Sequence, residues 1–126
     1  MPAPEPVEAV RVVASPPAID AARWASDTVV IRVAPDELLV VGADAPDVAD
    51  PHAIVERDRG FAAVSIAAAS VDDLQWRAAW PLPREPGTSG QGLLHGVPVK
   101  VVVRADGSVV VIVARAYAHE LEERLA

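Results

Sequence analysis

A glycine-rich stretch, GTSGQGLLHG at residues 87–96, is the first place in this sequence where chemistry is conceivable, because it holds four of the chain's seven glycines. Such loops bind phosphate when they follow a strand and open a helix, since the helix start then presents free backbone N–H groups to the anion. Here the stretch follows a proline-containing segment at 80–86 and leads into alternating valines at 97–103, and no lysine-serine pair ends it. We therefore interpret residues 83–96 as a mobile connection between a helix and a hairpin, and not as a nucleotide site.

A second cluster of potential ligands combines Asp44, Asp47 and Asp50 with His52. Carboxylate oxygens are the ligands that hard cations prefer, but the spacing is not that of an EF-hand loop. Prolines interrupt the cluster, which is typical of a solvated polar loop, where carboxylates are ordinarily exposed. No metal ligand is therefore predicted.

Nucleophilic catalysis lacks its usual residues. The three histidines are scattered through the sequence, no serine occupies a Gly-x-Ser-x-Gly turn, and the chain has no cysteine. No catalytic residue is predicted, and no residue is assigned to cofactor binding. That the chain is itself a small enzyme remains an alternative function, although no catalytic motif supports it.

Trp76 and Trp80 are more informative than these clusters. In a helix that begins at Val71, successive residues turn by about 100°, so the two tryptophans lie nearly opposite Val71 and Leu74. If the aliphatic side faces the core, both indoles face outward, and exposed tryptophans are enriched at protein interfaces. The other interpretation is that the helix is rotated, or that Trp80 folds back onto an aliphatic core at the frayed helix end.

The candidate interface residues are Trp76, Trp80, Arg77 and Tyr117. Tyr117 also begins a helical stripe with Leu121 and Leu125, which is most simply a core-facing stripe. Both interpretations of Tyr117 stay open at this point.

The elements that must position these residues follow from hydrophobic periodicity and turn residues. Strands are predicted at 28–33, 38–41, 53–55, 60–67, 97–103 and 108–114. Helices are predicted from Ser70 to Ala79, where Pro81 ends the helix, and from Tyr117 to the end of the chain, with a short helix or turn at 18–25. The expected class is α+β: a mostly antiparallel sheet with two or three helices packed on it, ferredoxin-like elements, and a single compact domain.

The N-terminal residues 1–17 are rich in proline, which fixes φ and removes backbone donors. We expect a flexible, extended arm over 1–17 and the α+β domain over 18–126. This N-terminal stretch lacks the basic start and the apolar run of a secretory signal, so export by that route is not expected.

Composition excludes some partners. The net charge of -7, with no cluster of lysine or arginine, disfavours nucleic acid and anionic membrane surfaces. The longest apolar runs are too short for a membrane-spanning helix. Without cysteine the chain fits a reducing compartment, and a soluble, cytoplasmic protein is expected.

Several segments resemble known proteins. Five segments are similar to the gamma subunit of heterotetrameric sarcosine oxidases. They are IRVAPDELLVVG at 31–42, residues 55–66, residues 70–82, the hairpin at 97–115 and RAYA at 115–118. They are more distantly similar to the folate-binding domain of the glycine cleavage T-protein. The resemblance spans roughly Thr28 to Leu125, but Trp80–Pro83 replaces the family's segment after the first helix.

This resemblance implies a non-catalytic accessory subunit that docks on a larger amine oxidase, with flavin and folate bound by the partner subunits. No catalytic or folate-binding residue carries over, because no position here matches a family motif for that work. Two alternatives remain: a stand-alone binder of a small, folate-like molecule, and the enzyme without a motif mentioned above. A homo-oligomer is the other partner to consider.

Overall fold

The computed structural model describes residues 2–25, 28–42 and 46–126. Its internal contacts divide into two compact units, each considered by itself. The inserted unit comprises Val7–Arg59, and the C-terminal unit comprises Met1–Pro6 with Gly60–Ala126. Two strands, β1 (Glu5–Val13) and β4 (Ile54–Ile66), contribute residues to both units.

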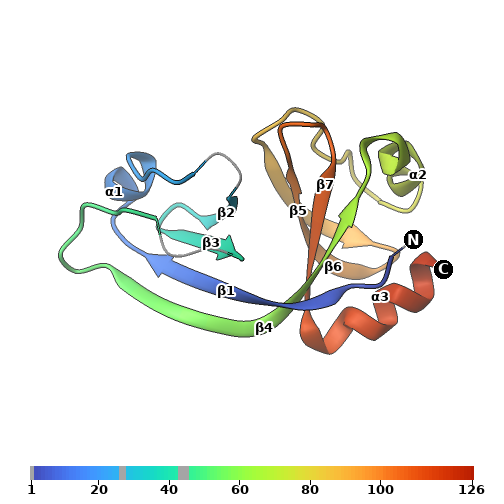
Figure 1. Cartoon of the computed structure of the whole chain (residues 1–126), viewed down its shortest axis with the longest axis horizontal. Helices are drawn as coiled ribbons and strands as arrows, with labels where there is room; N and C mark the ends of the chain where they lie inside the picture. Colours follow the sequence, from blue (N-terminus) through green and yellow to red (C-terminus); the bar gives the residue numbers. More distant parts are fainter. Residues whose placement is uncertain (1, 26–27, 43–45) are drawn as a thin grey trace. The chain divides into compact units, whose positions relative to one another are not determined.

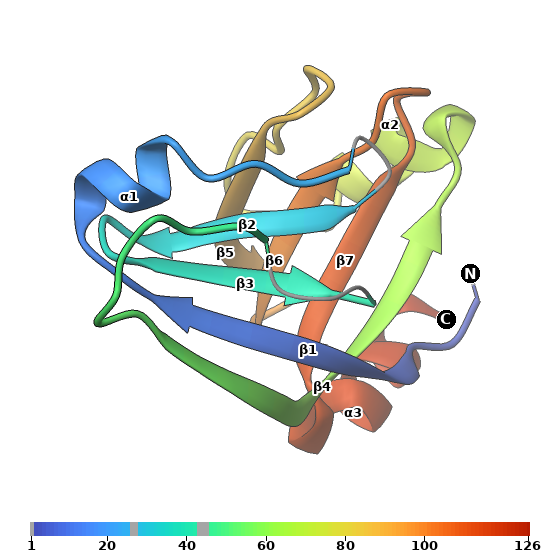
Figure 2. The same ribbon diagram turned by 60° about the vertical axis from the view of Figure 1, so that its left-hand side comes forward.

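The inserted unit is a twisted set of strands in the order β2-β3-β1-β4, with one short helix, α1 (Pro16–Asp20) (Figures 1 and 2). β2 (Val29–Ala34) and β3 (Glu37–Val41) form the predicted hairpin, because Pro35 presets the φ angle that a tight turn needs. β3 then pairs antiparallel with β1. One buried cluster of this unit is aliphatic and consists of Val12, Ala14, Ala18, Ile19 and Leu38.

The C-terminal unit has the strand order β4-β7-β6-β5, and the pairs β4–β7, β7–β6 and β6–β5 are antiparallel. β5 (Ser89–Leu94), β6 (Val97–Val103) and β7 (Val109–Ala114) are consecutive in the chain and form a meander. Two 3-10 turns, η1 (Ala68–Ser70) and η2 (Arg115–Tyr117), lead into α2 (Val71–Gln75) and α3 (Ala118–Leu125).

One face of these strands builds the core of the C-terminal unit. The odd-numbered valines of β6 and β7, from Val97 to Val113, contact Leu74 of α2 and Leu121 of α3. Because side chains alternate across a strand, a run of valines can fill such a core without aromatic residues. The short helices α2 and α3 are thereby fixed to the sheet by their apolar sides.

The α+β class, the antiparallel pairing and the late hairpin are confirmed. The ferredoxin-like order is wrong for the C-terminal unit, because a meander of β5, β6 and β7 replaces the split β-α-β unit of that fold. None of the helices in the described part of the chain has the length and apolarity needed to span a bilayer.

Three elements differ from the sequence-based expectation. Residues 5–13 form β1, although a flexible arm was expected over 1–17, because Ala9–Val13 pair with β3 and Ala9 and Val12 are buried. The predicted strands at 53–55 and 60–67 are one strand, β4. The helix predicted to reach Ala79 ends at Gln75, several residues before the proline that was expected to end it.

Candidate interaction surface

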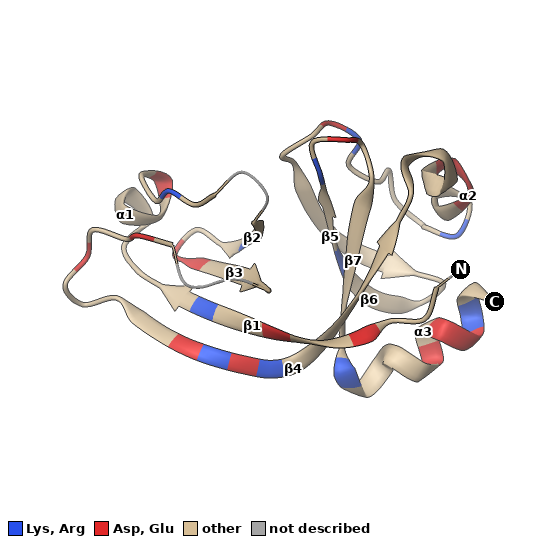
Figure 3. Ribbon diagram, viewed as in Figure 1, with Lys and Arg blue, Asp and Glu red and all other residues tan. Residues whose placement is uncertain are grey.

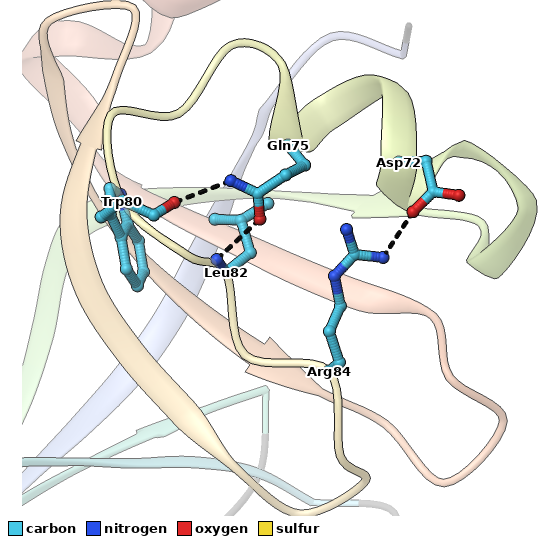
Figure 4. A network of polar contacts seen from close by, with 5 residues as sticks. All are labelled: Asp72, Gln75, Trp80, Leu82 and Arg84. Carbon is cyan, nitrogen blue, oxygen red and sulfur yellow. Dashed lines mark hydrogen bonds and ion pairs between the residues drawn. The ribbon is translucent and has the colours of Figure 1, made fainter.

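The segment that joins α2 to β5 is held by the side chain of Gln75. Its Nε2 donates to the carbonyl oxygen of Trp80 at 2.8 Å, and its Oε1 accepts from the backbone N–H of Leu82 at 2.8 Å (Figure 4). One amide side chain therefore uses both its donor and its acceptor on the backbone around Pro81, which itself offers no N–H. Nearby, Arg84 pairs with Asp72 at 2.8 Å and ties the far end of the segment to α2.

The backbone so fixed places the indole of Trp80 flat on β5. A Cβ atom added at Gly92 would lie 2.3 Å from the indole atoms Cε2 and Nε1, and one added at Gly90 would lie 2.9 Å from Cζ3. The indole N–H donates to the carbonyl oxygen of Leu93 at 3.1 Å, and the ring packs against the buried cluster of the C-terminal unit. Trp80 is thus a structural residue that folds back, which is the second of the two interpretations given above.

This contact explains the glycine-rich stretch. Gly90 and Gly92 are two apart, so they share one face of β5, and only glycine leaves room for an indole there. The interpretation of 83–96 as a mobile connection is wrong for 89–94, because these residues pair with β6 along their length. Gly90 and Gly92 make room for the indole of Trp80. They lie in a strand, whereas a phosphate-binding loop leads into the start of a helix.

The turn after β5 is closed by a non-glycine residue in the left-handed region, His95, with φ of 47°. Its backbone N–H donates to the carbonyl oxygen of Arg77 at 2.8 Å, and its carbonyl oxygen accepts from the guanidinium of Arg124. A two-residue His95-Gly96 turn of this kind needs positive φ at both positions, and histidine is among the residues that tolerate it. The turn is therefore held both by the segment that follows α2 and by α3.

Arg77 is a structural residue in this arrangement. Besides accepting from His95, it donates through Nη1 to the carbonyl oxygen of Leu125 at 2.5 Å. The bond caps the last turn of α3, whose carbonyl groups have no partner within the helix. The backbone carbonyl of Arg77 and its half-buried side chain are therefore both committed to the fold of the C-terminal unit.

Tyr117 and Trp76 are the predicted interface residues that do lie at the surface. Tyr117 is exposed in η2, whereas Leu121 and Leu125 are buried. The prediction that all three residues face the core is therefore wrong for Tyr117. Trp76 is 89% exposed, while Val71 and Leu74 on the opposite side of α2 are buried. The orientation predicted for this helix is therefore correct for Trp76.

The charge next to Trp76 is negative. Asp72 and Asp73, four and three residues before it, lie in the first turn of α2 and share its exposed side. Asp72 is paired with Arg84, whereas Asp73 forms no ion pair with any residue that the structure describes. An apolar side chain with an acidic neighbour thus marks this part of the surface.

The acidic loop and the histidines are not brought together. Across residues 2–25, 28–42 and 46–126, no group of three or more ligand-type side chains could hold a metal ion. Asp44 lies outside the described residues. Asp50 accepts backbone N–H bonds from Ser15 at 2.9 Å and His52 at 2.8 Å, which lower its pKa and make it a turn-stabilising residue.

Sequence reasoning missed one feature. Residues 54–59 of β4 are largely exposed on both faces, and the charges in Glu-Arg-Asp-Arg at 56–59 alternate in sign. The alternation is visible in the sequence, but its structural result follows only from the finding that 54–66 form one strand. In a strand, successive side chains point to opposite faces, so the acidic and the basic side chains lie on different faces.

No known protein-family model and no characterised protein matches this chain.

Proposed function

We propose that this chain is a non-catalytic protein-interaction module, an accessory subunit that docks on a larger protein through Trp76. The observation that carries the proposal is the 89% exposure of a tryptophan on a helix whose opposite side is fixed to the core. Burying most of an indole removes on the order of 200 Å² from water and stabilises a complex by about 3–5 kcal/mol. That is the magnitude of an interface hot spot.

The rest of the described surface supports a binding role over a catalytic one. No polar or charged side chain in the described residues is buried, so no group there has the desolvation that tunes catalytic acids and bases. The pKa values of Asp50 and Asp106 are lowered by hydrogen bonds within turns at exposed positions. A partner would therefore supply any chemistry.

The resemblance to sarcosine oxidase gamma subunits suggests what the partner is. It would be a larger amine oxidase that carries the flavin and the folate on its own subunits, in the cytoplasm. In this proposal Tyr117 lies at the margin of the contact, whereas Trp80 and Arg77 act indirectly by fixing α2.

The test compares Trp76→Ser with Trp24→Ser, a matched control because Trp24 is also exposed but belongs to the inserted unit. Both variants should keep the thermal midpoint of the parent. Only Trp76→Ser should lose the partner that co-purifies with the tagged chain from its native cells, by at least tenfold in quantitative mass spectrometry.

Two outcomes would contradict the proposal. One is a parent chain that is strictly monomeric and retains no partner. The other is a Trp76→Ser variant that retains the partner as the parent does. A rise in the thermal midpoint with added folates or flavins would instead favour the stand-alone binder, since a ligand that binds only the native state stabilises it.

A further inference from the structure

The indole of Trp76 has acidic neighbours on the exposed side of α2. Trp76 follows the last residue of α2 with helical backbone angles, φ of -62° and ψ of -20°. Asp72 and Asp73 therefore precede it at the spacings of four and three residues that bring side chains together on a helix face. Large side chains on a helix lean toward its N-terminal end, which is the direction of these carboxylates from Trp76. Figure 3 shows α2 with its acidic residues in red.

This part of the surface already holds one guanidinium group. Nη1 of Arg84 donates to Oδ1 of Asp72 at 2.8 Å, as Figure 4 shows. The adjacent Arg77 does not pair with Asp73, because its own guanidinium donates to the carbonyl oxygen of Leu125. Within the described part of the chain, the carboxylate of Asp73 is therefore left without a cationic partner beside the exposed indole.

An indole and a carboxylate that lie side by side favour a cation. The face of an aromatic ring carries negative charge, and among aromatic residues tryptophan attracts cations most strongly. The guanidinium of arginine is planar and weakly hydrated, so it can stack on the ring while its N–H groups donate to a carboxylate. The ammonium of lysine is compact and strongly hydrated, and it does not stack in this way. The net charge of -7 also attracts a basic surface from a distance.

We propose that Trp76 and Asp73 together bind an arginine side chain of the partner protein, stacked on the indole and paired with the carboxylate. The inference rests on the proposed function, because it specifies the chemical group that docks on Trp76. A purely apolar contact would desolvate the carboxylate of Asp73 without giving it a partner, which is costly. An acidic contact would place like charges together. An arginine satisfies both Trp76 and Asp73.

The probes are two blocked tripeptides that differ in one side chain. One is acetyl-Gly-Arg-Gly amide, and the other has citrulline, an uncharged isostere of arginine, in the central position. Titration of the arginine peptide into the ¹⁵N-labelled full chain should shift the indole N–H signal of Trp76 and the amide signal of Asp73. The initial slope of these shifts should be on the order of tenfold larger than with the citrulline peptide. The indole signals of Trp24 and Trp80 serve as internal references.

Four variants make the test specific. Asp73→Lys should abolish the preference for the arginine peptide, because it puts a like charge beside the indole, and Asp73→Asn serves if Asp73→Lys does not fold. Glu122→Lys changes the net charge equally at an exposed position of α3 and should keep the preference. Trp76→Leu retains an apolar side chain without an aromatic face and should lose the preference, whereas Trp76→Phe should keep part of it.

The arginine site is overturned if the two peptides shift the signals alike, if neither moves the indole signal of Trp76, or if Asp73→Lys keeps the parent's preference. Should Trp76→Ser still lose its co-purifying partner in that case, the proposed function stands and only the arginine site fails. Conversely, a chain that retains no partner but binds the arginine peptide as expected supports the site and contradicts the proposed function alone. Where a partner is retained, Asp73→Lys should reduce its amount at least tenfold and Glu122→Lys should not.

Discussion

The contact between Gly92 and Trp80 makes a quantitative prediction. In Gly92→Ala the new methyl carbon would lie 2.3 Å from indole atoms Cε2 and Nε1 and 2.7 Å from Cδ1. Ordinary contacts between such atoms are about 3.5–4.0 Å, so the indole must move by more than an ångström. It cannot do so and keep its hydrogen bond to the carbonyl oxygen of Leu93.

The expected cost combines three contributions. Loss of the hydrogen bond costs about 1 kcal/mol, and a displaced, poorly packed ring costs about 1–3 kcal/mol. Alanine in a strand recovers roughly 0.5–1 kcal/mol relative to glycine. We therefore expect Gly92→Ala to lower the free energy of unfolding by about 2 kcal/mol, which for a chain of this size lowers the thermal midpoint by roughly 8 °C.

The assay is a double-mutant cycle measured by urea unfolding. In a Trp80→Ala background the methyl group meets no ring, so Gly92→Ala should be neutral or slightly stabilising. Gly90→Ala, whose Cβ would approach the ring less closely at 2.9 Å, should cost less than Gly92→Ala. Equal destabilisation with and without the indole would refute the reasoning.

Three other changes test the remaining structural claims. Gln75→Leu should lower the free energy of unfolding by about 1–3 kcal/mol, because two backbone groups lose their partner, and urea unfolding measures it. Leu121→Ala, at a fully buried position, should cost about 2–5 kcal/mol by the same measurement. Bonds from Ser108 lower the pKa of Asp106 below its ordinary value of 3.8. The stabilisation is therefore present above that value and is lost as the pH falls through the folded-state pKa. Asp106→Asn should accordingly show a shallower loss of stability on acidification, in unfolding midpoints compared at pH 7 and pH 3.

The hairpin of β6 and β7 was predictable because its signals are local. Valines alternate with other residues at 97–103, and Asp106-Gly107 supplies a turn with positive φ at its glycine. The same holds for the hairpin of β2 and β3. In both, the residues that form the turn and those that form the ladder are neighbours in the sequence.

What sequence reasoning missed depends on partners far along the chain. Prolines near the N-terminus favour an extended arm, and the pairing of Ala9–Val13 with β3 is what makes most of it a strand. Likewise, Gly90 and Gly92 favour a flexible segment when the sequence is considered alone. Their contact with Trp80, ten or more residues earlier in the chain, is seen only in the structure. Of the candidate interface residues, Trp76 could be oriented from helical periodicity, whereas Arg77 is fixed by bonds to the turn after β5 and to α3.

The division of the chain into an inserted unit and a split C-terminal unit has a consequence for synthesis on the ribosome. All residues of the inserted unit have been made once Arg59 is added, whereas the C-terminal unit needs residues from Gly60 to Ala126. At about 5–20 residues per second, the second set follows over roughly 3–13 seconds. During that interval the nascent chain presents the strands and α1 of the inserted unit alone, so this unit is the first substrate that chaperones and proteases meet.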